Sequence, residues 1–424
     1  MIDKLIEGKL LTVLVGSVFR LVEILVRTVH VTVRGIRLLV QEVVTSRIDT
    51  WLSSFGKRMV ANRTRVEQSS IVLIERDGEY TGDPKYIAEE ILRRGAPLTI
   101  TWVLRDRSIG PFPSEFHFVK YGTAEYFRSV AGAKVVVQNA HCLQESGVVK
   151  GSSQQWVQTW HDPLGLKRLD SAGRDRRSYL RLRELDNTQT DVLLTNSTFE
   201  DDVFTETYWP DVPKSRIGHP RNDVLSDTSQ ETATRMRKKA LDRLDIADTG
   251  QRFLLYGPTR GGDPRATPLS GIDVNAVRAA LSERFGGTWE ILIRTHNSDK
   301  AQSDVLLAGL PAYCHNASFH PDVQELLVLA DAGMTDGAGW ICDYLLTAKP
   351  AFLFSTHERG TSRDLEKLPL PLATSNHALL RNIEQFDHEV HGREIGQFLE
   401  VSGSVDDGHA ASRVVDRLEE LMSR

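Results

Sequence analysis

Short apolar runs alternate with stretches of helical periodicity over most of the chain beyond residue 67. The runs that predict strands cover 71–74, 98–104, 133–137, 192–194, 253–256, 289–293 and 351–354. The stretches that predict helices cover 84–94, 231–244, 274–285, 323–330 and 410–422. Strands that alternate with helices in this way form parallel sheets with helices on their faces. The pattern therefore predicts an α/β fold of two doubly wound halves, joined at the polar segment 245–251, with a ligand cleft between them.

The first 66 residues follow a different pattern, which predicts an amphipathic helix over 18–40. At about 100° per residue, the polar side chains fall within one arc of the helical wheel and the apolar side chains lie opposite. The polar arc holds Arg20, Glu23, Arg27, His30, Arg34 and Arg37. The apolar face holds Val18, Val22, Leu25, Val29, Val33, Ile36 and Val40. A helix with a basic polar face is typical of a segment that lies in a membrane interface.

Charge and length indicate how this segment would meet a membrane. Residues 1–66 contain 11 Lys and Arg against 5 Asp and Glu. Near an anionic leaflet, each basic charge contributes about 1 kcal/mol to binding. The longest uncharged run covers residues 10–19, whereas a spanning helix needs about 20 residues. The prediction is therefore peripheral docking on an anionic membrane surface. The alternative is a helix that packs on the protein's own core and exposes its charged face.

Overall composition narrows the class of protein. The 424 residues are 40% hydrophobic and 26% charged, which excludes disordered and fibrous classes. The net charge of −5 gives no indication of nucleic-acid binding. Three scattered cysteines, Cys142, Cys314 and Cys342, are too few for a disulfide framework or a structural zinc site. No Asp-x-Asp pair occurs, so we expect no metal site of that kind. We also expect no cofactor.

Polar clusters follow several of the predicted strands. A strand-like run ends at His161, and histidine is the usual general base for a hydroxyl group near neutral pH. Residues 217–223 place Arg221 and Asp223 on a proline turn, which predicts either a ligand site or an ion pair between these two residues. His296 follows the predicted strand 289–293 and is either a site residue or an ordinary surface histidine.

Two segments rich in small residues lie in the second half. Residues 256–262 include Arg260 among three glycines, which allow a ligand to approach the backbone closely. Their spacing matches neither the dinucleotide fingerprint nor the P-loop. Residues 330–340 lie between a short strand and a helix, where small residues leave N–H groups open to a phosphate. The candidate ligand residues there are Thr335, Asp336 and Gly337. The alternative for 337–339 is a tight packing contact.

Taken in order, these clusters resemble the motifs of the CDP-glycerol glycerophosphotransferases of teichoic-acid synthesis. Segment 158–169 resembles the family's Gln-Thr-Trp-His-Gly-Thr-Pro-Leu-Lys-Lys motif, and segment 218–223 resembles Gly-Tyr-Pro-Arg-Asn-Asp. Segment 257–260 resembles Ala-Pro-Thr-x-Arg, and segment 293–296 resembles a strand followed by Lys-x-His. Further matching segments are 80–86, 330–336, 342–344 and 358–360. Residues 337–339 read Gly-Ala-Gly where the family has Tyr-Ser-Ser.

The resemblance implies a GT-B-like fold, in which two Rossmann-like domains face a cleft. Together with the membrane-associating segment over 1–66 predicted from its pattern, it gives an acceptor domain over 67–244 and a CDP-alditol donor domain over 245–424. By this resemblance, His161 is the general base and His296 is a second catalytic histidine. The residues implied to bind the donor and its phosphates are Arg221, Arg260, Thr335, Asp336, Gly337 and Arg359.

The resemblance also implies an activity. Members transfer glycerol phosphate or ribitol phosphate from CDP-glycerol or CDP-ribitol to a hydroxyl group of a lipid-linked or polymeric cell-envelope acceptor, and CMP leaves. This chemistry implies a peripheral enzyme on the cytoplasmic face of the cell membrane. The alternative enzyme is a GT-B glycosyltransferase that uses a nucleotide sugar. The non-enzymatic alternative is a membrane-surface scaffold that keeps a degenerate form of the GT-B fold. Only the altered segment 337–339 supports it.

Overall fold

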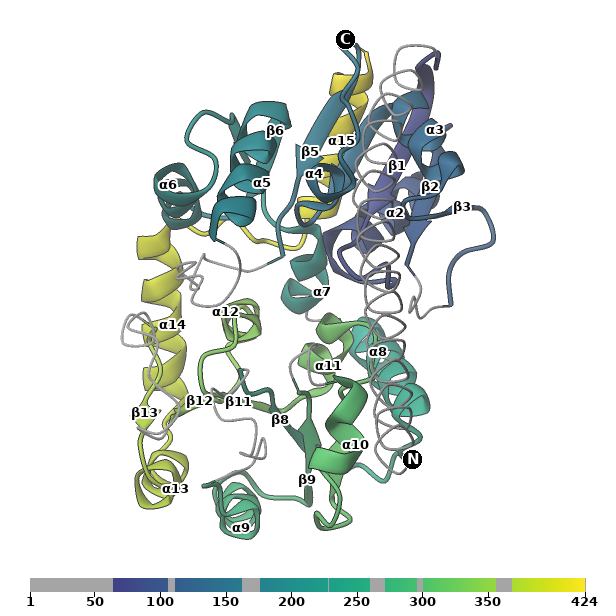
Figure 1. Cartoon of the computed structure of the whole chain (residues 1–424). Helices are drawn as coiled ribbons and strands as arrows, with labels where there is room; N and C mark the ends of the chain where they lie inside the picture. Colours follow the sequence, from purple (N-terminus) through teal and green to yellow (C-terminus); the bar gives the residue numbers. More distant parts are fainter. Residues whose placement is uncertain are drawn as a thin grey trace, which may run out of the picture. The chain divides into compact units, whose positions relative to one another are not determined.

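Two parallel sheets organise the described part of the chain in the computed structural model (Figure 1). The described residues are 64–105, 111–161, 176–227, 229–259, 271–295, 300–355 and 368–423, without the side chains of 176–178. The first sheet has the strand order β3-β2-β1-β4-β5-β6-β7, and the second has the order β10-β9-β8-β11-β12-β13. Both contain the 3-2-1-4-5-6 order of doubly wound folds. The helix predicted over 18–40 lies outside the described residues.

The first half of the chain supplies the first sheet and most of the helices around it. Its strands are β1 (Glu67–Ile74), β2 (Thr99–Leu104), β3 (His117–Lys120), β4 (Ala133–Gln138), β5 (Gln155–Gln158), β6 (Val192–Thr195) and β7 (Lys214–Arg216). Its helices are α2 (Gly82–Arg94), α3 (Ala124–Gly132), α4 (Cys142–Ser146), α5 (Arg176–Gln189), α6 (Thr198–Thr207), the 3₁₀ turn η2 (Pro220–Asn222), α7 (Asp223–Ser226) and α8 (Gln230–Leu244).

The second half repeats this plan. Its strands are β8 (Arg252–Tyr256), β9 (Trp289–Ile293), β10 (Cys314–Asn316), β11 (Ala332–Thr335), β12 (Ala351–Phe354) and β13 (Leu372–Ala373). Its helices are α9 (Val274–Phe285), the 3₁₀ turn η3 (Lys300–Gln302), α10 (Ser303–Leu306), α11 (Val323–Leu329), α12 (Trp340–Leu345), α13 (Asn376–Glu384), α14 (His388–Ser402) and α15 (Ala410–Met422).

The central strands are apolar on both faces because helices cover both sides of a parallel sheet. In β1, Val72 pairs with Thr101 of β2 on one side and Val136 of β4 on the other. Alternate residues of β1 enter different cores, since Ile71 packs in one cluster and Val72 in another. The apolar runs that predicted strands therefore became the buried centre of each sheet.

The last helix of the chain packs on the first sheet. Val414, Val415, Leu418 and Leu421 of α15 are buried in the same core as Ile71 of β1. Figure 1 shows α15 (yellow) beside the purple and teal elements of the first half. The predicted domain 245–424 thus contributes its final helix to the core of the predicted domain 67–244. The domain boundaries themselves stay predictions.

Most predicted elements agree with the structure to within a few residues. The helices predicted over 274–285 and 410–422 coincide with α9 and α15, and the strand predicted over 289–293 coincides with β9. The sequence pattern did not predict the short edge strand β3 or the long helix α14. None of the helices that the structure describes is long and apolar enough to cross a lipid bilayer.

Candidate functional site

The strand order creates one switch point in each sheet. In the first sheet the order reverses between β1 and β4, and in the second it reverses between β8 and β11. Chains leave such neighbouring strands toward opposite faces of the sheet, so a crevice opens at their carboxyl ends, where ligands of open α/β folds bind. The segments that follow these four strands therefore define where a site is expected.

His161 lies at the carboxyl edge of the first sheet, three residues after β5. Its Nδ1 lies 2.9 Å from the carbonyl oxygen of Asn139, and its Nε2 lies 2.8 Å from Nη1 of Arg76. A carbonyl oxygen only accepts and a guanidinium only donates, so Nδ1 carries the ring proton and Nε2 carries the lone pair. Nε2 is therefore the atom of His161 that can take a proton from a substrate.

Arg76 and Asn139 were not singled out in the sequence analysis. They follow β1 and β4, the two strands of the switch point. The side-chain oxygen of Asn139 accepts the backbone N–H of Arg76 at 2.8 Å, while its backbone carbonyl accepts the proton of His161. One residue thus connects the two strand ends to the imidazole.

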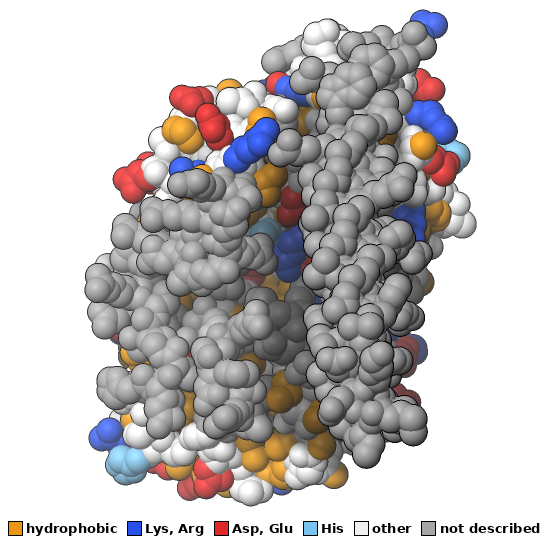
Figure 2. All heavy atoms as spheres, in the orientation of Figure 1, with side chains coloured by type: hydrophobic (Ala, Val, Ile, Leu, Met, Phe, Trp, Pro, Cys, Tyr) orange, Lys and Arg blue, Asp and Glu red, His pale blue; other side chains and the backbone are white. Residues whose placement is uncertain are grey.

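On the face in Figure 2, basic, acidic and histidine side chains lie close together near the centre of the described surface.

The residue before His161 has an unusual backbone conformation. Trp160 has φ of 56°, in the left-handed region, which costs a residue other than glycine about 1–3 kcal/mol. Its backbone N–H donates to the side chain of Gln158 at 3.0 Å. Its ring lies 5.1 Å from that of Trp209 and 4.5 Å from the imidazole of His161. This packing holds the turn that directs His161.

A buried carboxylate, Asp186 of α5, supports the same turn. It accepts hydrogen bonds from Gln158 at 3.0 Å and from Gln138, at the end of β4, at 3.1 Å. Nδ1 of His141 lies 2.7 Å from it, and the indole N–H of Trp209 donates at 3.3 Å. Asp186 therefore ties the ends of β4 and β5 to α5. This is a positioning role, because these partners lie behind the site.

Acidic and basic groups of the β1–α2 loop connect this edge to the second half of the chain. Burial, together with the nearby Asp77 carboxylate, raises the pKa of Glu75 to about 7. Glu75 accepts the backbone N–H of Glu79 at 3.0 Å. Oε1 of Glu79 lies 2.6 Å from Nζ of Lys300, which belongs to the segment after β9. His296 precedes Lys300 by four positions in the sequence and lies outside the described residues.

At the second switch point, Thr335 shapes the turn that follows β11. Its hydroxyl donates to the carbonyl of Gly257 at 2.7 Å and accepts the N–H groups of Gly337 and Ala338 at 3.1 and 2.9 Å. Gly337 has φ of 129°, which only glycine adopts readily. Two N–H groups of the predicted phosphate site are thus bonded within the turn, and α12 that follows has six residues. The predicted ligand roles of Thr335 and Gly337 stay predictions.

Asp336 and Gly257 bring the ends of β8 and β11 together. Oδ1 of Asp336 accepts the backbone N–H of Thr259 at 2.5 Å. The indole of Trp340 lies against Gly257, where an added Cβ would overlap the ring. The glycine at 257 is therefore required by a close packing contact. Arg260 and Arg359, the predicted donor ligands that would flank this region, lie outside the described residues.

Arg221 pairs with carboxylates that its sequence cluster did not indicate. It is buried, with its guanidinium 2.6 Å from Asp83 of α2 and 3.0 Å from Asp343 of α12. The alternative ion pair with Asp223 is wrong, since Asp223 accepts the N–H groups at the start of α15, including that of Ala410 at 2.8 Å. Two buried carboxylates pair with Arg221, and its predicted contact with a donor phosphate stays a prediction. It connects the two halves of the chain.

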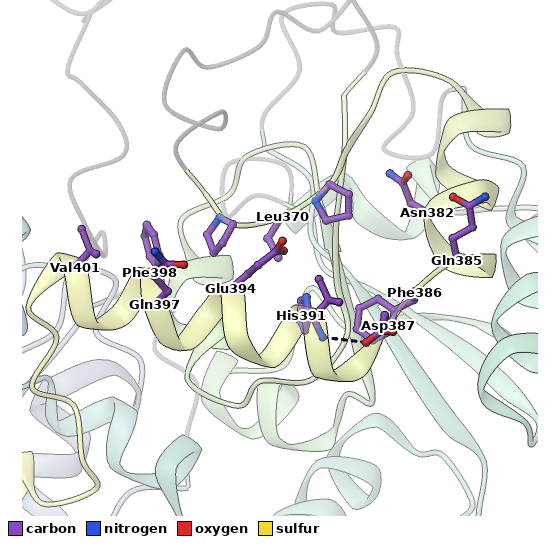
Figure 3. Close-up of a pocket in the computed structure, with 13 residues that line it drawn as sticks. Leu370, Asn382, Gln385, Phe386, Asp387, His391, Glu394, Gln397, Phe398 and Val401 are labelled. Atoms are coloured by element: carbon purple, nitrogen blue, oxygen red, sulfur yellow. Dashed lines mark hydrogen bonds between the residues drawn. The ribbon is translucent and has the colours of Figure 1, made fainter.

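A cavity of about 740 Å³ lies away from these residues, along α13, α14 and the segment before β13 (Figure 3). Its lining is mostly apolar and includes Phe386 and Phe398. His391 also lines it, but its Nε2 lies 3.0 Å from the carbonyl of Lys349. None of the predicted site residues that the structure describes lines this cavity. Among the described residues, no group of three His, Cys, Asp or Glu is placed to hold a metal ion.

Comparison with known proteins gives one consistent result. Residues 57–420 match the family model described as CDP-Glycerol:Poly(glycerophosphate) glycerophosphotransferase. A teichoic acid poly(glycerol phosphate) polymerase of Staphylococcus epidermidis is 24% identical over 359 residues, which cover 80% of this chain and 48% of the relative. The corresponding polymerase of Bacillus subtilis is 21% identical, with coverage of 84% and 50%. The chain thus spans about half the length of these two relatives.

Solved structures show the same fold. The structure of the wall teichoic acid polymerase TagF superposes with a TM-score of 0.72 at 22% sequence identity, and the match covers 89% of this chain and 96% of that chain. The predicted GT-B-like α/β architecture is therefore confirmed.

Proposed function

We propose, because this chain belongs to the CDP-glycerol:poly(glycerophosphate) glycerophosphotransferase family, that it transfers glycerol phosphate or ribitol phosphate from a CDP-alditol to a hydroxyl group. The acceptor is a lipid-linked or polymeric cell-envelope molecule, and CMP is released. The observation that carries the proposal is the placement of His161 at the switch point of the first sheet, with Nδ1 bonded to Asn139 and the lone pair on Nε2.

The proposed reaction needs one proton transfer on the acceptor side. Nε2 of His161 takes the proton of the attacking hydroxyl as its oxygen bonds to the phosphorus atom of the alditol phosphate. The bond between this phosphorus and the bridging oxygen of the pyrophosphate breaks, and that oxygen leaves with CMP. Phosphoryl transfer depends mainly on positioning and on positive charge around the transferred group. We assign this charge to Arg260, Arg359 and His296, beside the turn of Thr335, Asp336 and Gly337.

A donor panel tests this proposal. The protein is incubated with membranes and with labelled CDP-glycerol, CDP-ribitol or a UDP-sugar, and both the nucleotide released and the label in the lipid or polymer fraction are measured. We expect CMP release and label transfer from a CDP-alditol. Transfer from the UDP-sugar instead would favour the nucleotide-sugar glycosyltransferase. Absence of transfer from every donor, by a folded protein, would favour a non-catalytic scaffold.

The N-terminal segment supports a location for this activity. We infer that residues 1–66 dock the enzyme on the cytoplasmic face of the cell membrane, since their basic surplus and the apolar face of 18–40 fit an anionic interface. Replacing Arg27, Arg34 and Arg37 by Glu should abolish flotation with anionic liposomes at low salt. Replacing Arg381, Arg393 and Arg417 by Glu, in helices of the second half, is the matched control and should leave flotation unchanged. Flotation that survives the first set of changes would contradict the inference.

A further inference from the structure

Arg76 occupies the position that a substrate hydroxyl must reach. Its Nη1 donates to Nε2 of His161 at 2.8 Å, and Nε2 is the atom assigned to take the proton. The lone pair of an imidazole nitrogen accepts one hydrogen bond at a time. The guanidinium must therefore move from Nε2 before His161 can act as the general base. The group that binds this guanidinium in place of Nε2 therefore determines which acceptors allow His161 to act as the base.

The contacts of Arg76 with Asp77 are weak. Its side chain is 38% exposed, and its Nε and Nη2 lie 3.3 and 3.2 Å from the half-exposed carboxylate of Asp77. Ion pairs at such exposed positions are weak. The backbone of Arg76 is held separately, by the side chain of Asn139. A movement of the side chain would therefore leave the strand end in place.

A phosphate is the group best suited to draw the guanidinium away. Arginine binds phosphate through two parallel N–H donors, and such charge-assisted hydrogen bonds are stronger than those to a neutral imidazole. Resting on the proposed function, we propose that Arg76 binds the phosphodiester of the acceptor's terminal alditol phosphate unit and releases Nε2 of His161 as it does so. An acceptor that ends in a phosphate-linked unit would then activate the base, and a neutral acceptor would not.

In-line geometry places this phosphate on the acceptor rather than the donor. The attacking oxygen and the leaving oxygen lie on opposite sides of the transferred phosphorus. A group within hydrogen-bond distance of the base therefore lies beside the attacking molecule. In a glycerol phosphate chain end, the three carbons of one glycerol unit separate the free hydroxyl from the nearest phosphate. That spacing lets one chain end contact both His161 and Arg76.

The test compares two acceptors in the full-length protein. One lipid primer ends in a glycerol phosphate unit, and the other is the same lipid ending in an uncharged glycerol. For Arg76→Gln we expect KM for the phosphate-bearing primer to rise about 10-fold or more and KM for CDP-glycerol to stay unchanged. Turnover of the neutral primer should rise, because no guanidinium then occupies Nε2 of His161. Arg76→Lys keeps the charge and should restore part of the loss. Arg93→Gln removes an exposed guanidinium paired with Glu90 of α2 and is the matched control.

Two further measurements test the proposal whatever the cause of the kinetic loss in Arg76→Gln. The acid limb of the pH–rate profile should move to higher pH in Arg76→Gln, because a positive charge beside the imidazole has been removed. Glycerol 3-phosphate should bind the wild-type protein about 10-fold more tightly than Arg76→Gln, with or without turnover. Equal losses on both primers, a raised KM for CDP-glycerol, or unchanged binding of glycerol 3-phosphate would each overturn the proposal. A wild-type protein that binds glycerol 3-phosphate through Arg76 but transfers nothing would contradict the proposed function alone.

Discussion

Replacing His161 by Ala is expected to lower turnover by about 10²-fold or more while CDP-glycerol still binds. An acceptor hydroxyl holds its proton too tightly at neutral pH to attack phosphorus efficiently, and a positioned imidazole removes that proton in the transition state. The hydrogen bond from Nδ1 to the carbonyl of Asn139 keeps the lone pair on Nε2. Alanine removes the proton acceptor and leaves the buried turn around Trp160 intact.

Steady-state kinetics and donor binding together check this expectation. His117→Ala, on the exposed edge strand β3, is the matched control and should keep normal turnover. Added imidazole should restore part of the activity of His161→Ala, since it can occupy the space left by the ring. Near-normal turnover by folded His161→Ala would reject the general base. Loss of CDP-glycerol binding would instead place His161 in the donor phosphate site.

The fold was largely predictable because its signal is local. Buried parallel strands are apolar along their whole length, and amphipathic helices repeat every 3.6 residues. The helix over 274–285 and the strand over 289–293 therefore show in the sequence alone. The edge strand β3 was missed because it is short and mostly exposed, with only Val119 of its four residues buried.

The site was predictable only in part because it depends on strand order. His161 stands in a motif that can be recognised, but Arg76 and Asn139 become its neighbours only when β1 and β4 pair. They are separated from His161 by 85 and 22 positions in the sequence. Arg221 is a further case, since its buried partner Asp83 lies 138 positions away and is not indicated by its motif.

A buried ionic cluster joins the two halves and leads to a second large effect. Lys85 of α2 in the first half pairs with Asp322, which precedes α11 in the second half, and lies 3.3 Å from Glu325. The side chains of all three residues are at most 2% exposed. The hydroxyl of Tyr86 also donates to Asp322, at 3.0 Å. Burial would raise the pKa of the Asp322 carboxyl, but the Lys85 ammonium holds it below its usual value.

Lys85→Met should therefore lower the free energy of unfolding by about 3–5 kcal/mol, because it leaves Asp322 buried without its countercharge. Unfolding in urea measures this change, and Lys238→Met is the matched control. Lys238 forms an exposed pair with Asp242 on α8, at 2.6 Å, and its replacement should cost less than about 1 kcal/mol. Since the cluster connects the halves, Lys85→Met is also expected to separate their unfolding into two transitions.

The pH dependence gives this prediction a specific signature. With Lys85 present, the pKa of Asp322 is lower in the folded state than in the unfolded chain, where it is about 3.9. The ionised carboxylate therefore stabilises the fold above pH about 3.9, and this stability is lost as the pH falls through the folded-state pKa. Without Lys85, the hydrogen bond from Tyr86 and the nearby His320 still oppose the effect of burial on Asp322, and we expect burial, the largest influence, to raise its pKa above the unfolded value. The folded variant then binds this proton more readily than the unfolded chain, so its stability falls as the pH rises. The difference between wild type and Lys85→Met should therefore be large at pH 7 and smaller near pH 4. A difference that is constant over this range would show that the cost arises from lost packing of the lysine side chain and not from the buried charge.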